Sequence, residues 1–158
     1  MRRYLLDKGA EFRGRDNQTD TYFNVPHGRL KLRQGNIENN LIYYERNNQA
    51  GPKTSSFDLV AVPDAEKLKE MLARSLGLKV IVRKMREIFF INNVKFHIDE
   101  VPGLGHFAEI EASNKYADLP LEKLQEQCDF YMKELKIDAA DLVADSYSDM
   151  LLALQHEI

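Results

Sequence analysis

Charged side chains stand at every second position along several short stretches of this 158-residue chain. In the stretch Arg29-Leu30-Lys31-Leu32-Arg33, three cations alternate with two leucines. Successive side chains of a β-strand point to opposite faces, so the cations would share one face and the leucines the other. The same alternation puts charged residues on one face of three later stretches, namely Lys84 and Arg86, then Lys95, His97 and Asp99, then Glu109 and Glu111.

These charges suit two kinds of ligand that occur together. Lysine and arginine side chains in a row can bind a linear polyanion such as a triphosphate, because each phosphate oxygen accepts hydrogen bonds. Carboxylates such as Asp99, Glu109 and Glu111 would repel that polyanion unless they hold a hard divalent cation, Mg²⁺ or Mn²⁺. The alternative is a solvated sheet face, which is common in antiparallel sheets. We interpret His97 as a packing residue or a support for a ligand, and not as a metal ligand.

Alternation and turn residues predict seven strands, and apolar residues at helical spacing predict the helices. The apolar stripes of the helices must cover the apolar sheet face, which leaves the charged face inside. We therefore expect one α+β domain over residues 1–158, an antiparallel closed or cupped β-barrel with flanking helices. The expected strands cover residues 21–25, 29–33, 41–46, 57–62, 80–91, 94–99 and 107–112; the expected helices end before Gly9, run from Asp64 to Gly77 and from Pro120 to Leu135, and begin again at Ser146.

Composition excludes several classes of protein. The net charge is −3, yet residues 1–97 carry 18 Lys and Arg against 11 Asp and Glu, and residues 98–158 carry 4 against 14. Carboxylates so close to the basic strands argue against a nucleic-acid-binding surface. The single Cys128 excludes an internal disulfide, and no apolar run is long enough for a membrane helix. We expect a cytoplasmic protein without a membrane or nucleic-acid partner.

Several segments, in this order, resemble the CYTH superfamily of triphosphate tunnel proteins, which includes class IV adenylate cyclases, thiamine triphosphatases and inorganic triphosphatases. The similarity extends from about Gly9 to Leu152 and is strongest to the cyclase branch. The segments that carry it are Asp20-Thr21-Tyr22-Phe23, Gly28-Arg29-Leu30-Lys31-Leu32-Arg33, Leu41-Ile42-Tyr43-Tyr44-Glu45-Arg46, Gly51-Pro52-Lys53, Val82-Arg83-Lys84-Met85-Arg86, His97-Ile98-Asp99-Glu100-Val101, Gly103-Leu104-Gly105-His106-Phe107, Glu109-Ile110-Glu111 and Ser146-Tyr147-Ser148-Asp149.

The resemblance implies a tunnel of eight antiparallel strands, in which basic residues bind a triphosphate and acidic residues hold two divalent metal ions, Mg²⁺ or Mn²⁺. It implies a class IV adenylate cyclase that converts ATP to cyclic AMP and pyrophosphate. The alternatives are an inorganic, nucleoside or thiamine triphosphatase, and a non-catalytic polyphosphate- or nucleotide-binding module. The implied phosphate ligands are Lys31, Arg33, Arg46, Lys53, Lys84 and Arg86, and the implied metal ligands are Asp99, Glu109 and Glu111.

One signature of the family has no counterpart here. In the family, a Glu-X-Glu-X-Lys strand precedes the first helix, whereas the first predicted helix of this sequence starts at Met1. We therefore expect a barrel without its first strand, with two unpaired strand edges. Three explanations stay open: an internal start within a longer protein, a homodimer in which a second copy supplies the edge, or a protein that binds polyphosphate without turnover.

Overall fold

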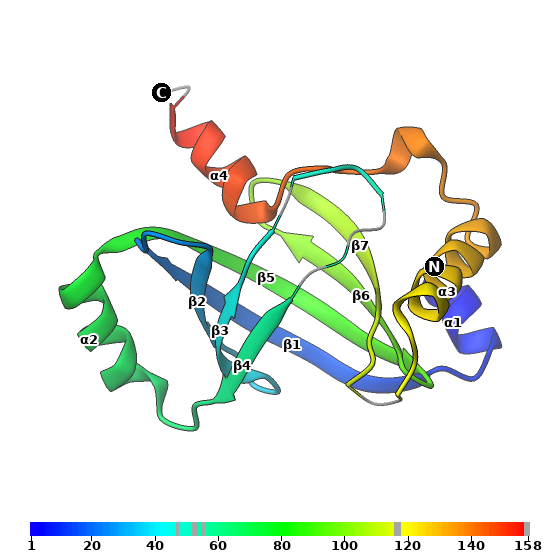
Figure 1. Cartoon of the computed structure of the whole chain (residues 1–158), viewed down its shortest axis with the longest axis horizontal. Coiled ribbons are helices and arrows are strands. Elements are labelled where there is room, and N and C mark those ends of the chain that lie inside the picture. The colour runs from blue at the N-terminus through cyan, green and yellow to red at the C-terminus, as the bar shows by residue number, and fades with distance from the viewer. Residues whose placement is uncertain (47, 52–53, 55, 116–117, 157–158) are drawn as a thin grey trace.

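Seven antiparallel strands form one curled sheet in the computed structural model, which describes residues 1–46, 48–51, 54, 56–115 and 118–156 (Figure 1). The strands are β1 (Glu11–Phe23), β2 (Arg29–Gln34), β3 (Asn39–Tyr44), β4 (Phe57–Ala61), β5 (Leu78–Ile91), β6 (Val94–Val101) and β7 (Gly105–Ala112). Their order across the sheet is β4-β3-β2-β1-β5-β6-β7. The helices are α1 (Arg2–Asp7), α2 (Ala65–Leu76), α3 (Leu121–Glu134) and α4 (Tyr147–His156), with a 3₁₀ turn η1 (Ala139–Asp141) before α4. The predicted α+β class is confirmed.

Strand β1 is much longer than the sequence predicted. It begins at Glu11 and not at Thr21, and it pairs with β5 from Glu11 opposite Phe90 to Phe23 opposite Leu78. The polar run from Asp16 to Thr19 hid this strand from an analysis of hydrophobic alternation. The error is informative, because polar side chains of that run are buried inside the curled sheet.

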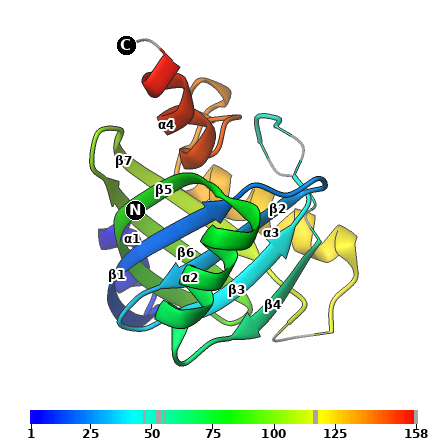
Figure 2. The same ribbon diagram turned by 90° about the vertical axis from the view of Figure 1, so that its left-hand side faces the viewer.

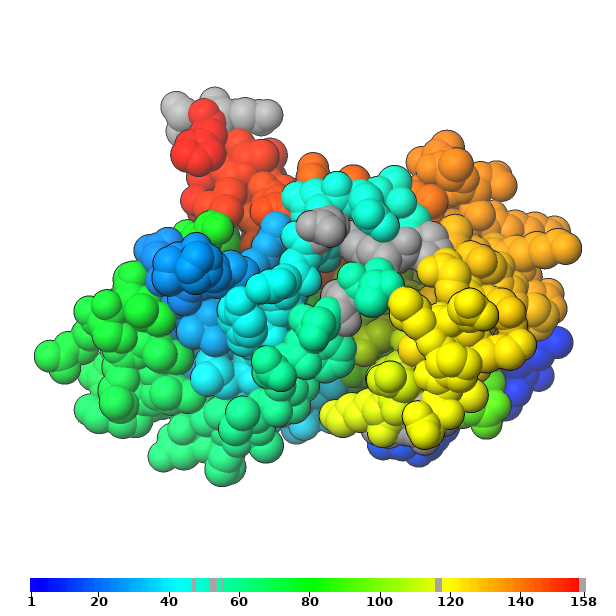
Figure 3. Space-filling model, viewed as in Figure 1, coloured from blue at the N-terminus to red at the C-terminus, as the bar shows by residue number. Residues whose placement is uncertain are grey.

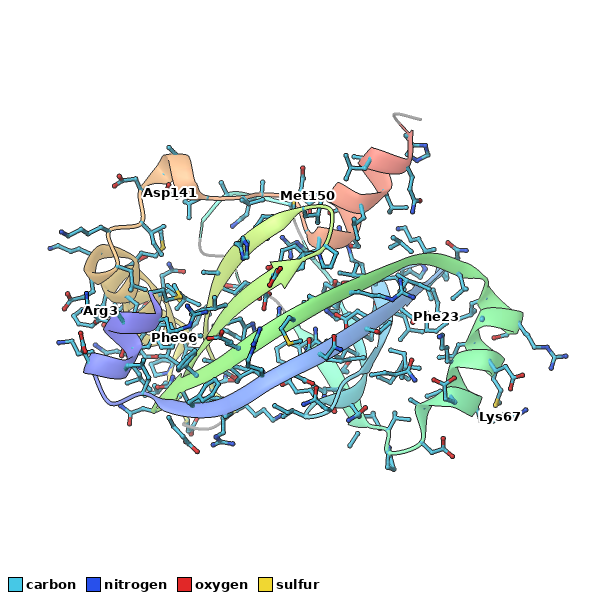
Figure 4. The ribbon with its side chains drawn as sticks, turned by 180° about the vertical axis from the view of Figure 1, so that it is seen from behind. Arg3, Phe23, Lys67, Phe96, Asp141 and Met150 are labelled. Atoms are coloured by element: carbon cyan, nitrogen blue, oxygen red, sulfur yellow. The ribbon has the colours of Figure 1, made fainter. Side chains whose placement is uncertain are left out.

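Three helices cover the apolar outer face of the sheet. Helix α2 crosses β1 to β3, where its residues pack against Phe23 and Leu32 (Figure 2). Helices α1 and α3 cover the other end, where Leu5 of α1 lies in one cluster with Phe89 and Phe96. Figure 4 shows Phe23 at the α2 end of β1 and Phe96 beside α1 and α3. Burial on the outer face therefore supplies two apolar clusters of the core, as the leucines of β2 predicted.

The opposite face, here called the inner face, carries the charged residues. Strand register puts Asp20 opposite Arg33, Arg86 opposite Asp99 and His97 opposite Glu109, so these side chains share one face. Asp20, Lys84, Arg86, His97 and Asp99 are each at most 3% exposed, although helices α1 to α3 lie on the outer face. The curl of the sheet itself encloses them. The predicted charged face is confirmed at the centre of the sheet, whereas the same face also carries buried apolar residues such as Val80 and Val82.

Helix α4 lies against one end of the inner face. Tyr147 and Leu151 pack on an apolar cluster that contains Val80 and Val101. The Ser146 hydroxyl accepts a hydrogen bond from the Asp149 backbone N–H at 3.2 Å, which caps the helix start that the sequence predicted. Arg29 of β2 donates to Ser146 Oγ at 2.7 Å and bridges to Asp149 at 3.1 Å. The C-terminal helix is thereby attached to the basic strand.

The curled sheet has two free edges, β4 and β7, which the strand order places at its ends. All five residues of β4 are exposed, among them Phe57, Leu59 and Val60. In Figure 3 the surface is hollowed between β4 and the yellow segment that leads into α3. The two unpaired edges that the sequence predicted are therefore present among the described residues. In the same part of the chain, every helix is too short or too polar to cross a membrane.

The turn between β2 and β3 is folded over the inner face and held by Asp16. This fully buried carboxylate accepts the backbone N–H groups of Asn36, Ile37 and Glu38 at 2.8 to 3.0 Å. A Cβ on Gly35 would lie 2.5 Å from Asp16 Oδ1, so a residue without a side chain is needed there. Asp16 is therefore a structural anion that fixes one end of the inner face.

We expect Asp16→Ala to lower the free energy of unfolding by about 3 kcal/mol, because several backbone donors lose their acceptor at once. Urea denaturation measures the change. The control is Asp58→Ala on the exposed strand β4, which should change stability by less than about 0.5 kcal/mol. Equal stability of Asp16→Ala and the wild-type chain would contradict this account of the turn.

Candidate functional site

One buried carboxylate, Asp20, gathers three cations at the centre of the inner face. Arg33 Nε and Nη2 each donate to it at 2.9 Å, one to each oxygen. Lys84 Nζ donates to Asp20 Oδ2 at 2.7 Å, and Lys31 Nζ lies 3.4 Å from the same oxygen. These cations come from β2 and β5, the two neighbours of β1 in the sheet. Asp20 thus holds cations from both sides in one place.

Burial and charge act in opposite directions on the pKa values of this cluster. Burial alone would raise the pKa of Asp20, but Lys31, Arg33 and Lys84 together hold it well below its ordinary value. Burial lowers the pKa of Lys84 to about 7, and Arg86, Arg33 and Lys31 add to this effect while Asp20 opposes it. Asp20 therefore stays ionised, and Lys84 is the cation of the cluster that most easily loses its charge.

A second buried pair lies beside the first. Arg86 Nε and Nη2 donate to the two oxygens of Asp99 at 2.7 and 2.6 Å. Tyr147 of α4 donates its hydroxyl to Asp99 Oδ2 at 2.9 Å. Both oxygens of Asp99 are thus engaged by the protein. Burial is the main cause that raises the pKa of Tyr147, and the carboxylates of Glu109 and Asp99 add to it, so its hydroxyl remains a donor.

Glu109 differs from the other inner-face carboxylates because it is 47% exposed. Its Oε2 lies 3.2 Å from His97 Nδ1 and 3.7 Å from Arg86 Nη2. The protein atoms around Glu109 displace part of its water and would raise its pKa, but His97 and Arg86 keep it well below its ordinary value. Glu109 is therefore an ionised carboxylate with one face open to a ligand.

At the other end of the inner face, Glu38 connects strands that are not neighbours. It lies 2.6 Å from Lys95 of β6 and 3.3 Å from Arg33 of β2, although β1 and β5 separate these two strands in the sheet. Burial would raise the pKa of Glu38, but Lys95 and Arg33 lower it to about 2. Glu38 is thus an ionised link across the curl.

The structure brings four of the six predicted phosphate ligands together and places Arg46 apart from them. Lys31, Arg33, Lys84 and Arg86 share the buried centre. Arg46 follows the end of β3 and donates to the Ala144 carbonyl at 3.1 Å, so it contacts the segment before α4. The sequence had placed Arg46 inside that strand, which ends two residues earlier. Lys53 lies outside the described residues.

The predicted metal ligands share one face but do not form a closed metal cage. Among the described residues, no three His, Cys, Asp or Glu side chains are grouped so as to hold a metal ion. Asp99 is taken up by Arg86 and Tyr147, whereas Glu109 and the half-buried Glu111 alternate along β7 toward the inner face. Two carboxylates with an open side fit Mg²⁺ or Mn²⁺, because Mg²⁺ commonly uses one or two carboxylates and completes its shell with substrate phosphates and water.

Sequence reasoning missed Asp20, Glu38 and Tyr147 as site residues. Asp20 could have been found, because a hairpin closed at Pro26-His27-Gly28 that pairs Phe23 with Leu30 also pairs Asp20 with Arg33. Nothing in the periodicity points to Glu38 or Tyr147. Their contacts depend on the curl of the sheet and on where α4 docks.

The inner face is an enclosed surface whose cations can bind an anionic ligand and whose carboxylates can bind a cation. Cations held by carboxylates in a buried setting interact strongly with any anion that replaces those carboxylates. The open carboxylates of Glu109 and Glu111 add oxygen ligands beside the cations. Such an arrangement can bind a polyanion and a hard divalent cation next to each other.

Comparisons with known proteins identify the family and the fold. A family model described as "CYTH domain" matches residues 1–147. A Methanocaldococcus jannaschii protein named "Putative adenylate cyclase MJ0240" is 31% identical over 93 residues, which cover 58% of this chain and 52% of that protein. The match therefore spans about half the length of that relative.

Solved structures share the fold. The PH1012 protein from Pyrococcus horikoshii OT3 superposes with a TM-score of 0.79 at 24% identity, over 94% of this chain and 90% of the other. A Vibrio parahaemolyticus protein described as a "putative adenylate cyclase" gives a TM-score of 0.74 at 20% identity, over 94% of this chain and 88% of the other. Likeness at these identities establishes the architecture alone.

Lys84 should make the protein more stable as the pH rises above neutral. Its folded pKa of about 7 lies below the ordinary value of 10.5, so the unfolded chain binds more protons between these two values. The free energy of unfolding should therefore rise from about pH 7 to 9, with a slope of at most about 1.4 kcal/mol per pH unit. Urea denaturation at several pH values measures this slope.

In the same measurement, Lys84→Met should remove the rise, and Lys79→Met, at an exposed position, should keep it. A wild-type curve as flat as that of Lys84→Met would show that Lys84 does not lose its proton in this range.

Proposed function

The chain belongs to the CYTH domain family, and we propose that it binds a triphosphate compound together with a divalent metal ion on the inner face of its sheet. With ATP, the proposed reaction is that of an adenylate cyclase, which yields cyclic AMP and pyrophosphate. The observation that carries the proposal is an enclosed row of cations from three strands: Lys31 and Arg33 of β2, Lys84 and Arg86 of β5, and Lys95 of β6. The name of the M. jannaschii relative supports the choice of a cyclase.

Charge balance supports entry of the triphosphate as a metal complex. Each of the five cations already has a carboxylate partner within 3.4 Å, drawn from Asp20, Glu38 and Asp99. A free polyanion would meet these carboxylates as well as the cations, and like charges at such distances repel strongly where water is scarce. A triphosphate that carries a divalent cation brings less negative charge. We therefore expect binding to require Mg²⁺ or Mn²⁺.

Glu109 and Glu111 would hold the metal ion, and the buried cations would hold the phosphates. A bound divalent cation supplies Lewis-acid polarisation of the phosphoryl oxygens. Arg33 and Arg86 present planar, two-pronged donor groups that suit phosphate, and their burial makes each contact stronger than it would be in water. Lys84 supplies a compact charge beside them. The role of these side chains is to fix the triphosphate in one orientation and to stabilise the charge that develops on its oxygens.

The reaction depends on which nucleophile lies in line with which phosphorus atom. In the cyclase reaction the 3′-hydroxyl of ATP attacks the α-phosphorus, and pyrophosphate leaves. Water that attacks the terminal phosphorus would give a triphosphatase instead, with the same cations in use. Binding without turnover is supported by the complete engagement of Asp99 by Arg86 and Tyr147. Product analysis separates the three.

Lys31→Ala combined with Arg33→Ala should abolish binding of tripolyphosphate in the presence of Mg²⁺, because two donors of the central cluster are lost. Isothermal titration calorimetry should show at least about a hundredfold weaker binding, on the basis of 1.5 to 3 kcal/mol for each charged hydrogen bond. Circular dichroism checks the fold. The milder Lys31→Gln should still weaken binding, and Lys67→Ala with Lys69→Ala on helix α2 should not. Unchanged affinity in the central double variant would overturn the site.

Purified protein incubated with ATP or tripolyphosphate and Mg²⁺ or Mn²⁺ should yield cyclic AMP and pyrophosphate from ATP, resolved by phosphorus NMR and chromatography. Orthophosphate as the product would identify a triphosphatase, and intact substrate with measurable binding would identify a binding module. If turnover is seen, Glu109→Gln should reduce it at least about a hundredfold, while Glu122→Gln on α3 should leave it unchanged. Full turnover by Glu109→Gln would exclude Glu109 as a metal ligand.

A further inference from the structure

His97 is a buried histidine that takes no part in the ion pairs of the central cluster. It is 2% exposed and stands on β6 between Ile88 of β5 and Glu109 of β7 in the sheet register. Its Nδ1 lies 3.2 Å from Glu109 Oε2. Its Nε2 is buried and has no hydrogen-bond partner among the described residues. Packing alone does not explain why this ring has a polar contact at Nδ1 and a buried, unpaired nitrogen at Nε2.

The chemistry of the pair fixes which nitrogen carries the proton. A carboxylate accepts hydrogen bonds and does not donate them, so the nitrogen that faces Glu109 must be the donor. A neutral imidazole has one N–H, which must therefore be on Nδ1, and Nε2 is left as an unpaired acceptor. The proton is thus assigned to Nδ1 because the Glu109 carboxylate needs a donor there.

The contact also orients the glutamate. Glu109 Oε2 is held by His97 and faces Arg86, whereas Oε1 has no partner among the described residues. The Glu109 side chain is 47% exposed while His97 is buried, so His97 anchors Oε2 and the protein leaves Oε1 available to a ligand. Hydrogen bonds of this kind, from a side chain behind a metal ligand, fix the orientation of that ligand and affect metal affinity.

We infer that His97 is a positioning residue, which donates through Nδ1–H to Glu109 Oε2 and so presents Glu109 Oε1 to a divalent cation. The inference rests on the proposed function for the identity of the ligand. It adds a residue that sets how well Glu109 binds that ligand. His97 itself touches neither metal nor substrate in this account.

Two substitutions separate the donor at Nδ1 from the bulk of the ring. In His97→Asn, the side-chain NH₂ group stands as many bonds from the backbone as Nδ1 and can still donate to Glu109. In His97→Gln, the NH₂ group stands as many bonds from the backbone as Nε2, one bond further out than Nδ1. It therefore extends beyond the position from which Nδ1–H donates to Glu109. Both variants are polar and similar in size, so a general loss of packing would affect them alike. His106→Gln, at an exposed position of β7, is the matched control.

The first readout is binding of Mn²⁺ in the presence of tripolyphosphate, followed by the electron paramagnetic resonance signal of free Mn²⁺. We expect His97→Gln to weaken Mn²⁺ binding by about 10- to 100-fold and His97→Asn to stay within about threefold of the wild-type chain. The control should match the wild-type chain. Equal affinity of the Asn and Gln variants, whether strong or weak, would overturn the inference.

The second readout needs neither metal nor activity. A long-range proton–nitrogen NMR spectrum of the ¹⁵N-labelled wild-type protein should show His97 protonated at Nδ1, and Glu109→Gln should perturb that resonance. Protonation at Nε2 would overturn the inference even if the chain binds triphosphate. Protonation at Nδ1 in a chain that binds no triphosphate would support the contact and count against the proposed function alone.

Discussion

The inner face of this protein depends on Asp20. Three cations on the two strands that flank β1 would repel one another in a buried setting, and among the described residues Asp20 is the one carboxylate that lies within 3.4 Å of all three, Lys31, Arg33 and Lys84. Burying any of these charges alone would cost several kcal/mol, and only their mutual arrangement offsets that cost. Asp20 is therefore what allows Lys31, Arg33 and Lys84 to be buried next to one another. The geometry available to a ligand is therefore a property of β1, a strand that contributes no cation to the cluster.

The curl of the sheet in turn depends on links between strands that are not neighbours. Glu38 reaches Lys95 across β1 and β5, and Tyr22 of β1 contacts Tyr44 of β3 through their hydroxyl groups at 3.2 Å. Helix α4 adds a third link, from Arg29 on β2 to Asp99 on β6. These links replace the closure that the order of the strands does not provide, since β4 and β7 remain at the ends of the sheet.

The sequence predicts those features of the fold and of the site that depend on residues close together in the chain. Alternation along β2 and β7 predicts which charges share a face, because strand geometry is local and has a period of two. The partner of Arg33 is also within reach, because the hairpin turn fixes its register with Asp20. The polar half of β1 gives no such signal, because its hydropathy is that of a loop and the main partners of Asp16 lie in the distant β2–β3 turn. The Glu38–Lys95 and Tyr147–Asp99 contacts span 57 and 48 residues, and no local pattern encodes them.

The low pKa of Lys84 has a calorimetric consequence. Near neutral pH this amine is only partly protonated, and a bound polyanion would favour its charged form. Association would then draw a fraction of a proton from the buffer, so the measured heat would contain the ionisation enthalpy of the buffer. Titrations in phosphate-free buffers of low and high ionisation enthalpy would differ in heat while giving the same affinity, and that difference would count the protons taken up by the inner face.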